Sequence, residues 1–325
     1  MEKKIRIGIL GYGNLGRGAE KAIKQNPDME LVGIFTRRDP KSLGCSAPVY
    51  QEKDLLQMQD KIDVLLLCGG SATDLPQQSP RWAEHFHIVD SFDNHSKIPE
   101  HFAACNKSAK ENNHIAFLST GWDPGLFSMM RVLFDAVLPQ GQGYTFWGKG
   151  VSQGHSDAIR RVAGVKDARQ YTVPVESALA RVRAGENPDL LVGDKHKRVC
   201  YVVAEEGADT ARIEKEIKTM PGYFADYDTA VHFITEEELR RDHSGIPHGG
   251  IVIHTATTGE ANQQKMEFSL ALDSNPEFTA SVLVACARAV MGLAENKDFG
   301  AKTILDVPLS YLSPKPADQL RKEML

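Results

Sequence analysis

The sequence predicts an α/β protein in which a Rossmann-like, doubly wound parallel sheet is joined to a second α+β domain built on a mixed or antiparallel sheet. Three observations support this prediction. The chain has 325 residues, more than the ~100–200 residues of a typical domain. Up to about residue 120, apolar strand-like runs alternate with helix-like patterns, which is typical of a parallel sheet with crossover helices. From Gly121 onward, glycine, aromatic and polar residues interleave with longer strand-like runs.

The first domain is expected to begin with Ile5–Leu10, an isoleucine-rich run suited to a strand that is buried on both faces. The next element is a helix at Gly16–Gln25, which carries helix-forming residues and ends before an Asn-Pro pair. Further strands are expected at Glu30–Phe35, Val64–Cys68, Ile88–Asp90 and Ile115–Ser119.

The second half of the chain is expected to form an open antiparallel sheet, one face of which lines a site. Strands are expected at Arg198–Ala204 and Ile251–Ala256, and helices at Ala178–Ala184 and Thr210–Thr219.

A long alanine-rich run at Thr279–Ala294 predicts a further helix, because alanine is the best helix former, and we expect this helix to pack back on the first domain. The polar tail that follows is expected to be peripheral. The dinucleotide-binding domain is therefore placed at residues 1–120 plus about 276–325. The substrate-binding and dimerisation domain is placed at residues 121–275.

Composition limits the classes of function. A net charge of −5 argues against a general nucleic-acid surface. No run approaches the ~18 uninterrupted apolar residues of a membrane helix. The five cysteines are scattered and lack CxxC pairs, which argues against disulfides and zinc and favours a reducing compartment. We therefore expect a cytoplasmic protein that binds no nucleic acid, membrane or metal.

The segment GYGNLG is the first candidate site. Glycines also mark any sharp turn, so the hexamer alone fits a turn as well as a phosphate site. Here it follows a buried-strand run and opens a helix, as a dinucleotide fingerprint requires, so the helix N-terminus offers free N–H groups to a pyrophosphate. In this interpretation Gly11 allows the tight turn, Gly13 lets the pyrophosphate approach, and Gly16 lets helix and strand pack closely. The candidate cofactor residues are Gly11, Tyr12, Gly13, Asn14, Leu15 and Gly16.

The end of the second strand indicates which dinucleotide is bound. NAD-binding chains usually carry an acid there for the ribose 2′-hydroxyl, whereas this chain reads Thr36-Arg37-Arg38. A guanidinium pairs bidentately with a 2′-phosphate, so NADP is favoured. Two solvated surface arginines are the alternative explanation, and Asp39 leaves a mixed preference conceivable.

The segment after the third strand is a further candidate for contact with the cofactor. It reads CGGSAT, and in a Rossmann sheet ligands bind at the carboxyl ends of strands. Ser71 and Thr73 are expected to make the contacts, although Ser and Thr also cap helices. The residues assigned to this contact are Cys68, Gly69, Gly70, Ser71, Ala72 and Thr73.

Several later motifs are too unusual to be generic, and they identify a family. With its SATD, DSFDNH, STGWDPG, FWGKGVSQGHSDAIRR, HKR, IPHGG and DSNPEFTAS segments, the chain resembles the meso-diaminopimelate D-dehydrogenases from GYGNLG to its C-terminal helix. That family is NADP-dependent and oxidatively deaminates the D-centre of a diamino diacid.

The resemblance assigns residues to the substrate. It implies that Asp93 and Asp123, which follow predicted strand ends, contact the substrate, and that Trp122 lies next to the nicotinamide. Both aspartates also fit roles as turn residues. At the non-reacting end it groups Thr172, Arg198, His248 and Asn275 on a carboxylate, which requires a cation and hydrogen-bond donors. It adds Trp147, Gln153 and Gly154 to the substrate site. His155 and His243 are expected to be structural.

The resemblance thus implies NADP-dependent, reversible conversion of meso-2,6-diaminopimelate to L-2-amino-6-oxopimelate and ammonia, in lysine and diaminopimelate biosynthesis, by a homodimer. Either Asp93 or Asp123, or an ordered water, is expected to accept the amine proton. Two alternatives stay open: a related two-domain NADP(H) reductase of an imine or aldehyde, and a non-catalytic NADP(H)-sensing protein.

Overall fold

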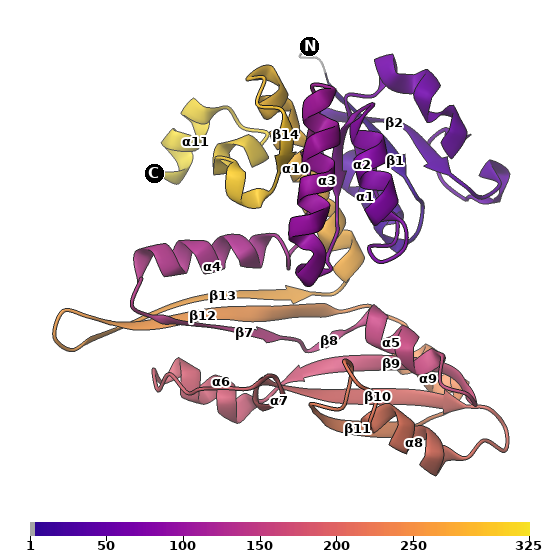
Figure 1. Ribbon diagram of the computed structural model, residues 1–325, viewed down its shortest axis with the longest axis vertical. Helices are drawn as coiled ribbons and strands as arrows, with labels where there is room; N and C mark the ends of the chain where they lie inside the picture. Colours follow the sequence, from indigo (N-terminus) through magenta and orange to yellow (C-terminus); the bar gives the residue numbers. More distant parts are fainter. Residues whose placement is uncertain (1–3) are drawn as a thin grey trace. The chain divides into compact units, whose positions relative to one another are not determined.

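The computed structural model describes residues 4–325 and divides into two compact units (Figure 1). One unit comprises the described residues up to Met129 together with Pro276–Leu325, and the other is Met130–Asn275. Helix α4 (Leu126–Val137) crosses the observed boundary.

The first unit is built on a seven-stranded parallel sheet. The strands lie in the order β14 (Gly300–Lys302), β6 (Ile115–Phe117), β5 (His87–Asp90), β4 (Val64–Leu67), β1 (Ile5–Leu10), β2 (Met29–Thr36) and β3 (Val49–Gln51). All the expected strands of this sheet are confirmed, whereas β3 and β14, with three residues each, were not expected. The order reverses direction between β1 and β4, which makes the carboxyl ends of these strands the switch point where such sheets bind ligands.

Helices cover both faces of this sheet, as a doubly wound fold requires. Ile7 and Ile9 of β1 lie in one core cluster with α1 (Asn14–Lys24) and α10 (Asn275–Glu295). Leu65 and Leu67 of β4 lie in the opposite cluster with α2 (Leu75–Ala83) and α3 (Ile98–Glu111). The remaining elements of this unit are the short helices η1 (Pro40–Ser42), η2 (Glu52–Lys61), η3 (His95–Lys97), η4 (Ile304–Asp306), η5 (Leu309–Leu312) and α11 (Ala317–Met324).

Helix α10 confirms the expected long alanine-rich helix. By length and composition alone it could cross a membrane, and half of its apolar window is buried inside the protein. Its buried residues, among them Leu283 and Val290, belong to the core cluster of the first unit. Helix α10 is therefore the core helix that the sequence predicted to return to the first domain.

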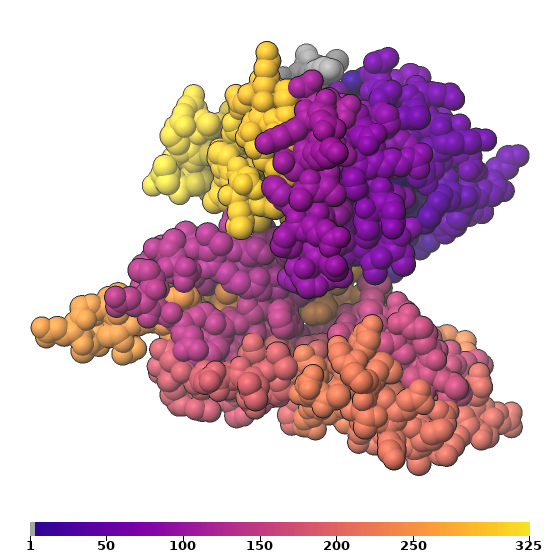
Figure 2. Space-filling view, viewed as in Figure 1, coloured from indigo at the N-terminus to yellow at the C-terminus, as the bar shows by residue number. Residues whose placement is uncertain are grey.

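The second unit contains two sheets, where the sequence analysis expected one open antiparallel sheet. A four-stranded sheet has the order β11 (Asp228–Phe233), β10 (His196–Ala204), β9 (Val165–Pro174) and β8 (Gly150–Val151). It is mixed, because β10 and β11 pair in parallel. The antiparallel three-stranded sheet has the order β13 (Asn262–Leu272), β12 (His248–Thr258) and β7 (Gln142–Trp147). The turn of the β12–β13 hairpin protrudes from this unit (Figure 2).

Each sheet of the second unit has its own apolar core. Ile159 of α5 (Gln153–Arg160) and Ile213 of α8 (Thr210–Lys218) pack on the four-stranded sheet. Leu179 of α6 (Glu176–Arg183) packs with Phe146 and Ile253 of the three-stranded sheet. The short helices α7 (Val192–Lys195) and α9 (Glu236–Asp242) complete the unit. The two cores exist because β7, which holds Phe146, pairs with β12 and is not hydrogen-bonded into the sheet of β8 to β11.

Candidate active site

The glycine turn after β1 has the geometry of a pyrophosphate cradle. Gly11 has φ +94°, a value that L side chains rarely adopt, and its N–H donates to the Phe35 carbonyl at 2.9 Å. A Cβ at Gly16 would collide with the Gly11 carbonyl oxygen. A Cβ at Gly13, the N-cap of α1, would meet no atom within 4 Å. The turn therefore needs two of its glycines for its own packing, and the third leaves open space at the helix N-terminus.

Tyr12 supports this turn with its side chain. The ring is buried, and its hydroxyl donates to Glu20 on the next turns of α1. Burial alone would raise the pKa of the Glu20 carboxyl, but hydrogen bonds from Ser46, Tyr12 and Lys24 outweigh burial and lower it to about 2. The Tyr12 side chain is thus engaged by α1, while its backbone carbonyl accepts a hydrogen bond from Arg38 Nη2 at 2.6 Å.

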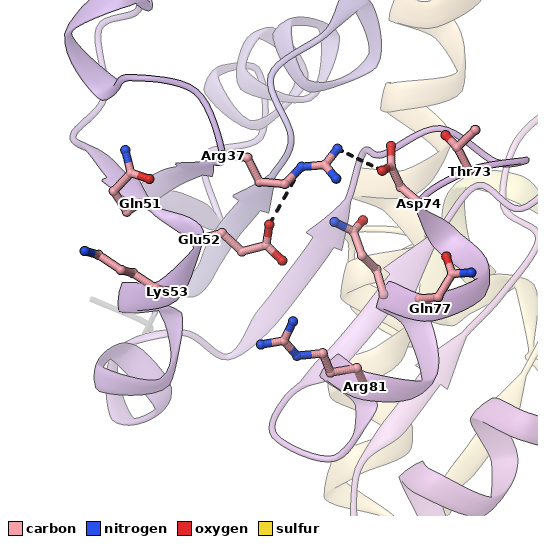
Figure 3. A pocket seen from close by; sticks show the side chains of 9 residues that line it. Arg37, Gln51, Glu52, Lys53, Thr73, Asp74, Gln77 and Arg81 are labelled. Atoms are coloured by element: carbon pink, nitrogen blue, oxygen red, sulfur yellow. Dashed lines mark hydrogen bonds and ion pairs between the residues drawn. The ribbon is translucent and has the colours of Figure 1, made fainter.

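The two arginines after β2 do different things. Arg38 lies against the glycine turn, and its own N–H donates to the buried Thr36 Oγ1 at 3.1 Å. Arg37 points across a cavity of about 510 Å³ to Asp74 and Glu52 (Figure 3). The cavity is lined by Arg37, Gln51, Glu52, Lys53, Thr73, Asp74, Gln77, Gln78 and Arg81. It joins the carboxyl ends of β2 and β4 and offers cations to an anionic ligand.

The turn after β4 connects this cavity to the next loop. Asp74 Oδ2 accepts a hydrogen bond from the Gly70 N–H at 2.8 Å. Ser71 Oγ accepts one from the Asp93 N–H at 2.9 Å. Burial raises the pKa of the Cys68 thiol to about 12, so Cys68 is an inert packing residue rather than a reactive one.

Asp90 organises the loops that carry the two candidate catalytic aspartates. This fully buried carboxylate at the end of β5 accepts hydrogen bonds from Ser79 Oγ at 2.6 Å and from the backbone N–H groups of Phe92 and Ser119 at 3.1 and 2.9 Å. His101 Nε2 lies 2.7 Å from its Oδ2. The sequence analysis quoted Asp90 within a motif but gave it no role. Four donors meeting at one carboxylate are not visible in a sequence.

Asp93 and Asp123 both lie in the first unit. Asp93 is exposed in the loop after β5, and Asp123 is half-buried in the bend before α4. Trp122 is buried, with its ring packed edge-on against Phe127 at 5.2 Å between centroids. Both carboxylates thus follow strands β5 and β6 at the ligand-binding edge of the sheet.

In the second unit, Arg198 and Thr172 form the centre of a polar site. They are directly opposite each other on β10 and β9, and Arg198 Nη1 donates to Thr172 Oγ1. The guanidinium carbon lies 3.9 Å from the centroid of the Tyr227 ring. Arg198 is only 8% exposed, and burial lowers its pKa. Its Nε is buried without a hydrogen-bond partner among residues 4–325, so the site presents a buried cation that can still bind an anion.

Trp147 is held beside this site by His196. The two rings stack with centroids 5.1 Å apart, and the backbone N–H of Trp147 donates to His196 Nε2 at 2.8 Å. Burial, with the charges of Arg198 and Lys195, lowers the pKa of His196 to about 4. The imidazole is therefore neutral at pH 7, and Nε2 stays free to accept. His196 appeared in the sequence analysis only as part of the HKR motif.

Gly150 allows His248 to approach Thr172 closely. Gly150 pairs with Thr172, and a Cβ on Gly150 would lie 2.5 Å from Cγ of His248. His248 begins β12, and its Nδ1 accepts a hydrogen bond from the Gly249 N–H at 2.8 Å. The Asn275 N–H donates to the Ile246 carbonyl, two residues before His248.

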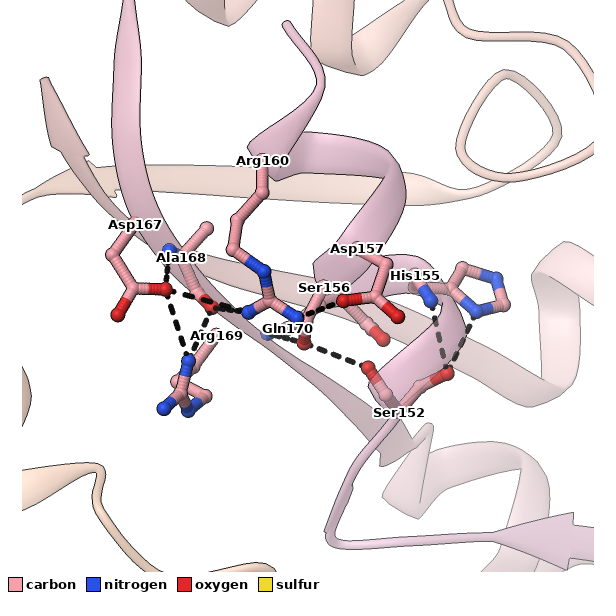
Figure 4. Close-up of polar contacts among 9 residues, drawn as sticks. All are labelled: Ser152, His155, Ser156, Asp157, Arg160, Asp167, Ala168, Arg169 and Gln170. Carbon is pink, nitrogen blue, oxygen red and sulfur yellow. Dashed lines mark hydrogen bonds and ion pairs between the residues drawn. The ribbon is translucent and has the colours of Figure 1, made fainter. Parts of the chain in front are cut away.

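Gln153 and Gly154 occupy the exposed first turn of α5, directly after β8. Ser152 caps this helix, and its Oγ also lies 2.8 Å from Nδ1 of His155 (Figure 4). Gln170 N donates to Ser156 Oγ at 2.9 Å, which ties α5 to β9. His155 is consistent with the expected structural role, because burial lowers its pKa to about 4 and its ring packs on Tyr223.

Two groups of candidate residues are thus defined. The first unit carries the candidate cofactor residues with Asp93, Trp122 and Asp123, and the second carries the candidate residues around Arg198. Among residues 4–325, no cluster of three or more His, Cys, Asp or Glu could hold a metal ion.

The chain is similar to known proteins along nearly its whole length. A family model described as the diaminopimelic acid dehydrogenase C-terminal domain matches residues 121–274. A meso-diaminopimelate D-dehydrogenase of Ureibacillus thermosphaericus is 59% identical over 99% of both chains.

Solved structures of such enzymes are also similar to this chain. A six-residue mutant of the Clostridium tetani enzyme with DAP has a TM-score of 0.95 at 55% identity, and the C. glutamicum DAP dehydrogenase in complex with DAP has 0.94 at 48%. An engineered D-amino acid dehydrogenase bound to NADP+ has 0.89 at 46%. Each comparison covers 99% of this chain and 100% of the other.

Proposed function

The chain belongs to the family of meso-diaminopimelate D-dehydrogenases, and we propose that it catalyses the NADP-dependent, reversible oxidative deamination of the D-centre of meso-2,6-diaminopimelate. The products are L-2-amino-6-oxopimelate and ammonia. In reverse, the reaction is a reductive amination that supplies diaminopimelate and lysine synthesis. The observation that carries the proposal is the buried Arg198, which has Thr172 and Tyr227 beside it and can still bind an anion.

The residues of the first unit fit NADP. The open space at Gly13 leaves room for a pyrophosphate, and Arg37 and Arg38, which lie beside the glycine turn and the cavity, are the cations for the 2′-phosphate. Ser71 and Thr73 follow β4 on the other side of the switch point. When bound, NADP⁺ would supply the acceptor for the hydride that leaves the substrate carbon. The protein contributes the orientation and the electrostatics.

Asp93 and Asp123 bind the amine at the reacting end. An ammonium has no lone pair to support the developing C=N bond, so a proton must leave before hydride transfer. Either carboxylate, or a water held by one of them, accepts that proton. Asp90 supports this role by tying down both loops through Phe92 and Ser119.

The residues around Arg198 select the stereocentre. The two centres of the meso compound are mirror images, so only a site that binds the far L-centre presents the D-centre to the cofactor. Arg198, Thr172 and His248 bind the far carboxylate, and Asn275 assists. Trp147, Gln153 and Gly154 complete the substrate site.

The Clostridium tetani structure supports this assignment. Its six substitutions replace a Gln, a Thr, an Arg, a Pro, a His and an Asn. Their order and spacing along that chain are those of Gln153, Thr172, Arg198, Pro247, His248 and Asn275 here.

The experiment offers NADP⁺ with meso-, LL- and DD-diaminopimelate in separate assays and follows the absorbance of the reduced nicotinamide. The proposal predicts turnover of the meso isomer alone. A related imine or aldehyde reductase, or a NADP(H) sensor, would oxidise none of the three. The buried cation at Arg198 favours the dehydrogenase, because a sensor has no need for a second anion site.

We further propose that the protein is a cytoplasmic homodimer. All five cysteines are free, as a reducing compartment requires. Helix α4 exposes Val132, Leu133 and Val137, which are 53, 47 and 56% exposed and suit a contact with a second subunit. Sedimentation equilibrium should give twice the chain mass, and a monomer at micromolar concentration would contradict the dimer.

A further inference from the structure

The cavity lined by Arg37, which is proposed to bind the 2′-phosphate, already contains an anion that is paired with this arginine. Arg37 Nη2 lies 2.8 Å from Asp74 Oδ1, and its Nε lies 4.0 Å from Glu52 Oε2 (Figure 3). The Arg37 side chain is 68% exposed, whereas Asp74 is 19% and Glu52 15% exposed. The arginine is thus the partner that is free to change rotamer, and the carboxylates are its fixed counterparts.

Asp74 is fixed by a second contact. Its Oδ2 accepts a hydrogen bond from the Gly70 N–H at 2.8 Å, and its own N–H donates to the Gly70 carbonyl at 2.8 Å. A Cβ on Gly69 would lie 2.8 Å from Cβ of Asp74, so the turn is packed around this residue. When Arg37 turns toward another anion, the Asp74 carboxylate stays in the cavity.

We propose that Asp74 is a specificity-determining residue, because it competes with the 2′-phosphate of NADP for Arg37. This inference rests on the proposed function and names how its cofactor site is tuned. A phosphate carries nearly two negative charges at neutral pH and accepts a guanidinium bidentately, so it displaces the carboxylate. The remaining carboxylate repels the phosphate, whereas an acid near this position can accept a hydrogen bond from the 2′-hydroxyl of NAD. Asp74 therefore weakens the binding of NADP relative to that of NAD, so the preference for NADP is smaller than it would be without this carboxylate.

The test replaces Asp74 by Asn. The amide oxygen still accepts from the Gly70 N–H, but the charge that holds Arg37 is gone. Isothermal titration calorimetry measures the binding of 2′,5′-ADP and of 5′-ADP, which lacks the 2′-phosphate. Asp74→Asn should bind 2′,5′-ADP about two- to five-fold more tightly, as expected for loss of one exposed ion pair. Binding of 5′-ADP should not tighten, and the gain should shrink at high salt.

Two controls separate this effect from a general change in charge. In an Arg37→Ala background, Asp74→Asn should no longer tighten 2′,5′-ADP to the same degree, because the contested cation is absent. Glu52→Gln, which removes the more distant carboxylate, should act in the same direction but more weakly than Asp74→Asn.

The outcomes separate a failure of the NADP assignment from a failure of the role proposed for Asp74. If the native protein binds 2′,5′-ADP no better than 5′-ADP, the NADP assignment fails, and the inference fails with it. If the native protein prefers 2′,5′-ADP but Asp74→Asn binds it no more tightly, the NADP assignment stands and the role of Asp74 is overturned. An equal gain with and without Arg37 would overturn that role too.

Discussion

At the scale of single residues, Arg198 has the clearest consequence for catalysis. Arg198→Met keeps the length and apolar stem of the side chain but removes the cation that we propose binds the far carboxylate. We expect kcat/KM for meso-diaminopimelate to fall by about 30- to 1,000-fold, the equivalent of ~2–4 kcal/mol of lost transition-state binding. Steady-state kinetics checks this, with NADP⁺ affinity as the control that should not change. Full kcat/KM in the variant would refute the assignment.

Asp90 has the clearest consequence for stability. Asp90→Ala leaves the donors of Ser79, Phe92 and Ser119 buried without an acceptor, so the free energy of unfolding should fall by ~3 kcal/mol or more. Asp90→Asn keeps an acceptor for the two backbone N–H groups and should lose clearly less. Urea unfolding of both variants measures the difference. Equal stability of Asp90→Ala and the native protein would show that the loops are held by other contacts.

At the scale of elements, the β1–α1 turn separates a glycine needed for folding from one needed for binding. Gly16→Ala puts a Cβ against the Gly11 carbonyl and should lower the melting temperature. Gly13→Ala enters open space, so the melting temperature should stay close to the native value while the Kd for NADP⁺ rises at least ten-fold. Calorimetry and titration of the two variants check this. If Gly13→Ala binds NADP⁺ with the native Kd, the turn is not part of the cofactor site.

The contact between β7 and β10 predicts that the stability of the protein depends on pH. His196 has a folded pKa of about 4 against a usual value of 6.5, so the unfolded chain takes up this proton first as the pH falls. The protein should therefore lose stability between pH 6.5 and 4 on account of His196. His196→Gln retains an acceptor for the Trp147 N–H but cannot titrate, and its loss of stability over this range should be smaller. An NMR titration that gives His196 a pKa near 6.5 would contradict this prediction.

The elements also show which features of the fold a sequence reveals. Ile5–Leu10 was predicted to the residue because its run is apolar except for the partly buried Arg6, as is typical of a strand buried on both faces. β14 was missed because its three residues become a strand only by pairing with Ile115–Phe117, far away in the chain. The split of the second half into two sheets was missed because the choice of strand partners is made by tertiary contacts.

At the scale of the whole molecule, the sequence placed the candidate residues in two groups but not the supports that hold them. Arg198 was assigned through a family motif, whereas His196, which positions Trp147, became visible only once β7 and β10 were placed. Asp74 was missed for the same reason, because its contact with Arg37 joins the ends of two strands.

The central claim, that hydride leaves the D-centre of the meso compound, is tested most directly by isotope labelling. meso-Diaminopimelate is prepared with deuterium on Cα of either the D-centre or the L-centre, and the reduced cofactor is analysed by mass spectrometry. We predict that the substrate labelled at the D-centre transfers its deuterium to the cofactor, whereas the substrate labelled at the L-centre transfers none. Deuterium from the L-centre, or from neither centre, would contradict the account.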